Sequence, residues 1–344
     1  MRILYRIFLI FTVVIFSMNQ INAQYVTNVS KRGTSVAAFL KVAQGARATG
    51  MGGAFVGIAD DASSMYWNVA GIARLKNNTM MFDHTQWIAD LKYNFIAGTM
   101  NLGSFGTIGV SLTASDYGEM NVTTVDEPNG TGEVFSVKDY AISLAWAINL
   151  TEDFAIGFNP KVVYEGIWQT SGYAFGIDVG VLYNTPFKGV TLGMSINNFS
   201  SKMRLQGTSQ IVLYDPDLGT TGNNGRIPSQ LYSENWSLPL TFTIGISYKV
   251  LNSDMNKLVL DVDAHHPSDN YESVSVGGEY VFNQSISLRG GYKTLFLRNV
   301  EESFTLGAGF QQRLLGNISL RIDYAYLNFG RLNSVHKISF GVNF

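Results

Sequence analysis

The chain has 344 residues and a formal net charge of −2, with 35 glycines, 13% aromatic residues and only 15% charged residues. The lack of cysteine excludes a disulfide scaffold, a thiolate metal site and a cysteine nucleophile. The low charge and high aromatic content exclude intrinsic disorder, and the lack of a basic block argues against nucleic acid as a partner. This composition is typical of a β protein that meets lipid on one face.

Residues 1–23 have the pattern of a secretory signal peptide. Arg2 and Arg6 precede an apolar stretch at 7–16, and Ala23 offers a small residue for cleavage. The alternative is a membrane anchor, but the apolar stretch is shorter than the ~20 residues that a spanning helix needs. We therefore expect export through a cleaved signal peptide.

Residues 24–77 show no alternation of apolar and polar residues and are predicted to form short helices and loops. We call this segment the plug, because it precedes the barrel predicted below and is expected to lie inside its lumen. Glycines at 50, 52 and 53 permit tight turns. Asp60 and Asp61 precede two serines and predict a helix start, because Asp and Ser side chains cap free N–H groups. An acid–base pair of the two aspartates is the alternative interpretation.

Residues 78–344 alternate between apolar and small polar positions, which predicts strands with two unlike faces. In 238–251, for example, Phe242, Ile244 and Ile246 share one face, and Thr243 and Ser247 lie on the other. Most of the predicted strands have the length that a tilted membrane strand requires. The pattern predicts fourteen strands, at 79–88, 91–101, 104–115, 138–149, 153–165, 172–184, 187–199, 238–251, 256–266, 271–282, 285–296, 302–314, 316–328 and 335–344.

The predicted connections sort by length, with the long ones, 116–137 and 200–237, at one end and short turns at the other. Bacterial outer-membrane barrels have this arrangement, whereas a soluble propeller or sandwich has no reason for it. The expected fold is therefore all-β, a 14-stranded antiparallel transmembrane β-barrel with an N-terminal plug. Tyrosines near strand ends predict interfacial girdles, at Tyr93, Tyr140, Tyr164, Tyr183, Tyr248 and Tyr280.

The last strand alternates and stops on Phe344. A final strand that ends on an aromatic residue resembles the signal used by the barrel-assembly machinery of Gram-negative outer membranes, and an ordinary edge strand is the alternative. We therefore predict Phe344 as an assembly signal, the cell outer membrane as the location, and outer-membrane lipid and the assembly machinery as partners.

The plug also carries a family resemblance. Its segments 39–41, 45–47, 50–55, 60–63, 66–68 and 70–71 resemble the N-terminal signature of the PorV/PorQ family, a branch of the FadL-like fourteen-strand barrels of Bacteroidetes. Val69 stands where that family usually has proline. The resemblance implies a protein-binding component of the type IX secretion system that receives secreted cargo or other secretion-system proteins. The plug motif that it marks comprises Gly50, Gly52, Gly53, Asp60, Asp61, Trp67, Asn68 and Gly71.

Motifs for chemistry are missing from the sequence: it has no HExxH, no GxSxG and no EF-hand loop. The adjacent His265 and His266 predict a solvated strand end rather than a metal site. We therefore expect no enzymatic activity, no catalytic residues, no metal and no cofactor.

Two functions remain as hypotheses. The secretion role would use aromatic residues of loop 200–237, at Tyr214, Tyr232 and Trp236, to bind a protein partner, unless this loop packs on itself over the barrel mouth. The alternative is a FadL-like transporter of hydrophobic small molecules, gated by the plug. Lumen-facing positions are mostly small and polar and favour the first hypothesis, because an apolar ligand needs an apolar pocket; the charged ones are Lys161, Asp178, Lys249, Asp261 and Asp263.

Overall fold

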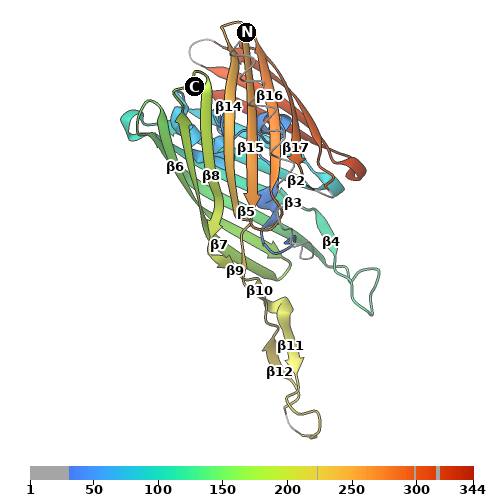
Figure 1. The fold of residues 1–344 in the computed structure, drawn as a ribbon. Coiled ribbons are helices and arrows are strands. Elements are labelled where there is room, and N and C mark those ends of the chain that lie inside the picture. The colour runs from blue at the N-terminus through green and yellow to red at the C-terminus, as the bar shows by residue number, and fades with distance from the viewer. Residues whose placement is uncertain (1–30, 223, 298–299, 315–317) are drawn as a thin grey trace, which may run out of the picture. The chain divides into compact units, whose positions relative to one another are not determined.

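The computed structural model describes residues 31–222, 224–297, 300–314 and 318–344. The predicted signal peptide at 1–23 lies outside these residues. Residues 32–344 form one unit, built around a closed antiparallel sheet of fourteen strands (Figure 1). Within the described ranges, the helices are all too short or too polar to cross a membrane.

Each barrel strand pairs with the next one along the chain, and the last strand pairs with the first to close the barrel. The fourteen strands are β1 (Thr79–Gln86), β2 (Lys92–Asn101), β3 (Thr107–Asp116), β5 (Val134–Asn149), β6 (Phe154–Ile167), β7 (Thr170–Asn184), β8 (Val190–Ser200), β14 (Thr241–Asn252), β15 (Asn256–Pro267), β16 (Ser273–Phe282), β17 (Ile286–Leu295), β18 (Phe304–Arg313), β19 (Ser319–Asn328) and β20 (Ser334–Asn343).

The predicted fold is confirmed, and each predicted strand overlaps one of these fourteen. The alternation places small polar residues inside the barrel and bulky apolar residues outside. On β14, Thr243 is 3% exposed and its neighbour Ile244 is 38% exposed. Because successive side chains of a strand point to opposite faces, this pattern gives the barrel an apolar outer surface.

One predicted girdle residue is placed wrongly. Tyr93 is buried inside the barrel, because β2 turns Tyr93 and Phe95 inward and exposes Ile96. Its ring packs edge-on against Trp87 and Tyr117. Tyr280 is half-buried and donates a hydrogen bond to Asn256. The other predicted girdle residues are exposed, namely Tyr140, Tyr164, Tyr183 and Tyr248.

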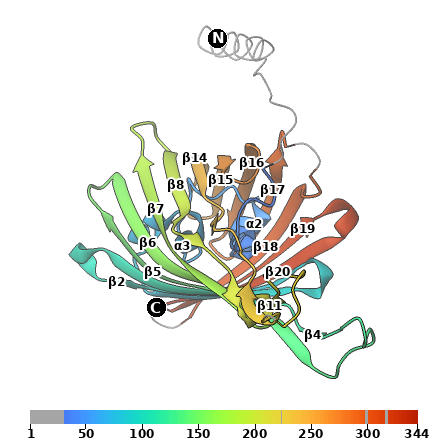
Figure 2. The same ribbon diagram turned by 90° about the horizontal axis from the view of Figure 1, so that it is seen from below.

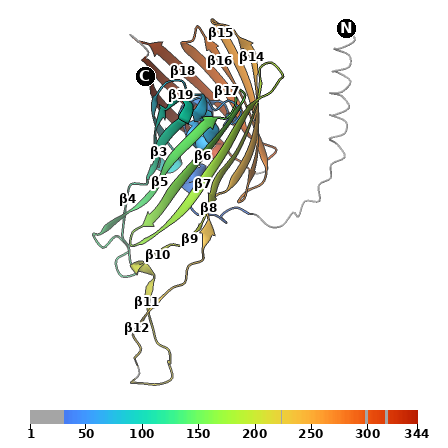
Figure 3. The same ribbon diagram turned by 90° about the vertical axis from the view of Figure 1, so that its left-hand side faces the viewer.

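The two ends of the barrel differ. The long-loop end carries the connections 117–133 and 201–240, and the short-turn end carries brief turns such as 102–106 and 150–153. The first long connection holds β4 (Glu119–Asn121), which pairs with β5. The second holds a separate hairpin of β11 (Ile211–Tyr214) and β12 (Ile227–Gln230), which extends beyond the barrel strands (Figure 3). Its remaining strands are β9 (Lys202–Met203), β10 (Gln206–Gly207) and β13 (Trp236–Ser237).

The described part of the plug lies inside the barrel, as the view along the barrel shows (Figure 2). It contains the helices α2 (Ala46–Gly50) and α3 (Ser64–Trp67) and the 3₁₀ helices Ala38–Lys41 and Val69–Arg74. Its apolar side chains, such as Met65 and Ile72, pack with wall residues such as Phe95. Further 3₁₀ turns lie in the connections, at Ile88–Asp90, Gly103–Phe105, Thr208–Gln210 and Gly330–Leu332.

Candidate functional site: the plug and the cavity beside it

The plug backbone touches the barrel wall directly at wall glycines. A Cβ atom added to Gly193 on β8 would lie 2.1 Å from the carbonyl oxygen of Val56, and one added to Gly277 on β16 would lie 2.0 Å from that of Met51. Both distances are far below van der Waals contact, so a larger residue would push the plug away from the wall. The plug is therefore packed as part of the interior.

The structure explains why glycine is needed at the predicted plug-motif positions. Gly52 and Gly53 have φ angles of 70° and 75°, which residues with a side chain rarely adopt. Gly50 lies against Gly307 of β18, and a Cβ on Gly71 would lie 2.0 Å from the carbonyl oxygen of Ala59. These glycines therefore allow tight turns and close backbone approach.

Trp67 and Asn68 connect parts of the plug to each other and to the wall. The indole N–H of Trp67 donates to the carbonyl oxygen of Gln44 at 2.8 Å. The side-chain amide of Asn68 donates to the carbonyl oxygens of Val56 and of Val181 on β7, each at 3.0 Å. Asn68 is fully buried, and these bonds satisfy both of its amide hydrogens.

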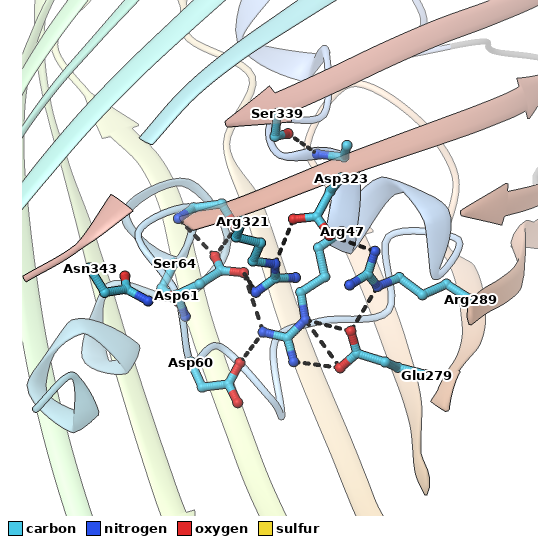
Figure 4. Close-up of polar contacts among 12 residues, drawn as sticks. Arg47, Asp60, Asp61, Ser64, Glu279, Arg289, Arg321, Asp323, Ser339 and Asn343 are labelled. Carbon is cyan, nitrogen blue, oxygen red and sulfur yellow. Dashed lines mark hydrogen bonds and ion pairs between the residues drawn. The ribbon is translucent and has the colours of Figure 1, made fainter. Parts of the chain in front are cut away.

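A buried ion network joins the plug to three wall strands (Figure 4). Arg47 of α2 lies 2.6 Å from Glu279 of β16, and Glu279 also pairs with Arg289 of β17 at 2.7 Å. Arg289 and Arg321 both reach Asp323 of β19, at 2.8 and 2.6 Å. Opposite charges held in a buried site need such pairing, so the network holds the plug at the wall.

Asp60 and Asp61 belong to the same network. Both accept from Arg47, and Asp61 also lies 3.8 Å from Arg321. Asp61 accepts the backbone N–H of Ser63 at 2.9 Å, immediately before α3 begins. Asp61 therefore accepts a backbone N–H next to the helix start. Both aspartates also pair with Arg47, and this pairing was not predicted from the sequence.

Wall carboxylates also bind the plug backbone. Asp263 of β15 accepts the N–H groups of Phe55 and Val56 at 2.8 and 2.9 Å. Asp83 of β1 accepts the N–H of Gly45 at 3.0 Å and pairs with the buried Lys337 at 2.9 Å. Asp263 and Asp83 therefore help to hold the plug backbone at the wall.

A cavity of about 670 Å³ lies between the plug and the long-loop end. The loop residues Asn270 and Tyr271 line its outer part. Its floor is apolar and comes from the plug, at Phe39, Leu40, Val42, Val56, Met65 and Trp67. Its walls carry hydroxyl groups, among them those of Ser111 and Thr113 on β3, Ser143 on β5, Thr241 and Thr243 on β14 and Ser275 on β16, together with the imidazole of His265 on β15.

The two adjacent histidines point to different places, as neighbours on a strand do. His265 lines the cavity, and its ring nitrogens lie 3.2 Å from the hydroxyls of Thr243 and Ser275. His266 is exposed and pairs with Glu272 at 3.0 Å. The prediction of a solvated strand end therefore holds for His266 and is wrong for His265.

The aromatic residues proposed for partner binding are all exposed. Tyr214 lies on the β11–β12 hairpin and is 55% exposed. Tyr232 is 67% exposed with the guanidinium of Arg204 at 4.4 Å from its ring centre, and Trp236 pairs with Met203 between β13 and β9. Tyr232 and Trp236 thus lie at the base of the hairpin, and the structure brings neither of them to the cavity.

The last residue, Phe344, continues the strand pairing that closes the barrel. Its backbone exchanges two hydrogen bonds with Asn78, at 2.9 and 3.0 Å, next to the pairing of β20 with β1. Its side chain is exposed.

These features define a plugged fourteen-strand β-barrel with a cavity at its long-loop end. The same fold is found in the CymD monoaromatic hydrocarbon channel, with a TM-score of 0.54 and 16% identity over 87% of this chain and 96% of that one. It is also found in the Pseudomonas putida toluene transporter TodX, with a TM-score of 0.54 and 13% identity over 87% and 97%. The Ralstonia pickettii toluene transporter TbuX also has this fold, with a TM-score of 0.52 and 12% identity over 87% of this chain and 97% of that one.

The chain belongs to the uncharacterised protein family UPF0164, whose model matches residues 14–217. That match covers the plug and the barrel as far as the β11–β12 hairpin. Among curated protein sequences, no match to this chain is found.

Proposed function

We propose that this protein is an outer-membrane barrel that admits a small, largely apolar molecule from the long-loop side into the cavity beside its plug. The supporting observation is the cavity of about 670 Å³ with its apolar floor, a size that suits a small organic ligand. Short turns would then face the periplasm and long loops the exterior, as in other outer-membrane barrels. Export would use the signal peptide at 1–23.

The sequence alone favoured the secretion role over transport of a hydrophobic small molecule, whereas the cavity favours transport. Most of the predicted lumen-facing strand positions are small and polar, and they gave no indication of an apolar pocket. The apolar surface comes from the plug, whose residues Phe39 and Met65 face the same cavity as the wall hydroxyls, and from Tyr93 and Phe95 of β2. The cavity therefore offers an apolar ligand the apolar surface that the strand pattern alone did not indicate.

The proposal is tested by filling the cavity. Thr113→Trp on β3 would place a large ring in the cavity, because Thr113 lines it and is 7% exposed. Leu112→Trp, one residue away on the outer face, is the matched control. Uptake of 1-naphthalenemethanol by cells that lack their own hydrocarbon channels should fall for Thr113→Trp and persist for Leu112→Trp. Equal uptake by both folded variants would contradict the proposal.

A second candidate is a protein-binding component of the type IX secretion system, as the PorV/PorQ resemblance implies. The exposed β11–β12 hairpin favours it, because Ile211, Leu213 and Tyr214 present apolar surface without burying it against the barrel. This function would need no passage through the lumen.

The hairpin can be removed cleanly to test this candidate. The carbonyl oxygen of Gln210 accepts the N–H of Leu231 at 2.9 Å, so the hairpin's ends are adjacent and 211–230 can be replaced by Asn-Gly. The secretion role predicts loss of secreted cargo from pulldowns of the tagged barrel, with uptake unchanged. Loss of uptake with cargo binding intact would contradict it.

A further inference from the structure

The charges that line the cavity are already paired. Lys161 lies 2.7 Å from Asp178 at the β6–β7 wall, and Lys293 lies 2.5 Å from Glu302 across the β17–β18 connection. Lys41 of the plug lies 2.8 Å from Asp269 in the loop after β15. Among the described residues that line the cavity, these pairs account for all the lysines and carboxylates.

This pairing decides what charge a ligand can carry. An anionic ligand would have to displace a carboxylate that the protein itself holds against each lysine, and it would lose its own hydration on entry. A cationic ligand meets the reverse difficulty at Asp178 and Glu302. A neutral ligand leaves all three pairs intact and loses less hydration, so it is favoured.

The cavity also offers hydrogen bonds that suit a neutral polar group. The hydroxyl oxygens of Ser111 and Ser143 lie 2.7 Å apart, and either can donate to the other. Hydroxyl groups can rotate to donate or accept, so they can serve an alcohol, a phenol or an ether oxygen. These groups lie on the wall, opposite the apolar floor of the plug.

From these observations we propose that the cavity selects a neutral amphipathic ligand, with an apolar body against the plug and a hydroxyl-type group toward the wall, and discriminates against carboxylates and amines of the same size. This inference rests on the proposed function and specifies the ligand class of the same cavity.

The test compares three naphthalene compounds that differ only in their polar group: 1-naphthalenemethanol, 1-naphthoate and 1-naphthylmethylamine. Their binding to the full chain in lipid nanodiscs is measured by fluorescence anisotropy at pH 7, with the Thr113→Trp variant as the blank for partition into lipid. The alcohol should bind about tenfold more tightly than either ion.

Freeing one lysine should shift this preference. Glu302→Gln removes the partner of Lys293, so the preference for alcohol over naphthoate should fall severalfold. Glu301→Gln is the matched control, because Glu301 pairs with the exposed Arg331 and does not line the cavity. Asp269→Asn, which frees Lys41, provides a second variant with the same expected direction if Glu302→Gln fails to fold.

The outcomes separate the two proposals. Naphthoate binding as tightly as the alcohol in the wild type, or an unchanged preference in both freed-lysine variants, would overturn the inference and leave the proposed function standing. Binding of all three compounds no better than in the Thr113→Trp blank would overturn the proposed function itself.

Discussion

Arg47 and Glu279 lie 232 residues apart in the sequence and are joined by a direct ion pair of 2.6 Å inside the barrel. Arg47 comes from the plug and Glu279 from β16, so this pair fastens the interior segment to the wall. Both side chains are largely buried, and the guanidinium also reaches Asp60 and Asp61. The plug is therefore held by charge as well as by close packing.

Removing Glu279 should loosen this attachment. Glu279→Gln leaves the buried Arg47 and Arg289 with one carboxylate fewer, and breaking a buried pair in this way costs about 3 kcal/mol. The urea midpoint of unfolding in detergent should fall accordingly. Glu301→Gln breaks only the exposed pair with Arg331 and should leave the midpoint nearly unchanged, because exposed ion pairs contribute little to stability. Equal effects of the two substitutions would contradict the role of the network.

A charge on the outer face should impair membrane assembly. Ile244 points outward near the middle of β14, and arginine at the midplane of a lipid-facing strand costs about 2–4 kcal/mol. Ile244→Arg should therefore lower the amount of heat-resistant, folded barrel in the outer membrane, whereas Ile244→Leu should not. Normal assembly of Ile244→Arg would show that this face does not meet lipid.

The last residue should matter for assembly through its ring. Deleting Phe344 removes both the predicted recognition signal and two backbone hydrogen bonds to Asn78, so outer-membrane levels should fall. Phe344→Trp retains the backbone and an aromatic ring and should assemble normally. Normal levels after the deletion would argue that the terminal residue is only the end of a strand.

The attachment of the plug's first turn should depend on pH. Burial acts to raise the pKa of Asp269, but hydrogen bonds from Lys41 and Ser35 hold that pKa below its ordinary value. A carboxylate with a lowered pKa stabilises the folded state above its ordinary pKa and loses that contribution as the pH falls through the lowered value. Hydrogen exchange at 36–42 should therefore rise more steeply below pH 4 in the wild type than in Asp269→Asn. Parallel profiles would contradict this coupling.

The alternation of apolar and polar residues predicted the barrel well, because the pattern can be recognised in each strand separately. Each residue of a strand faces either lipid or lumen, so Thr243 and Ile244 reveal their sides locally. Tyr93 was misplaced because β2 carries large residues on both faces: Tyr93 and Phe95 point inward, and Ile96 points outward. Size alone does not distinguish a lipid-facing tyrosine from one that lines a cavity.

The site itself could not be predicted, because it forms between segments far apart in the chain. The cavity needs the apolar side of the plug, at Phe39 and Met65, to face hydroxyls of strands that begin at residue 107 or later. The charge network likewise depends on which wall strand each plug residue meets. The glycines at 52 and 53 were recognised as turn residues from the sequence, but their closeness to Tyr292 and Trp67 was not.

The most direct test of the central claim is to locate a bound ligand. A diazirine derivative of 1-naphthalenemethanol, photoactivated in outer membranes that contain the protein, should label plug residues such as Met65 and Tyr66, which line the cavity. Excess 1-naphthalenemethanol and the Thr113→Trp substitution should each abolish this labelling, as read by mass spectrometry. Labelling confined to 201–240 or to the outer face of the barrel, and unaffected by Thr113→Trp, would contradict the claim that the cavity beside the plug is the binding site.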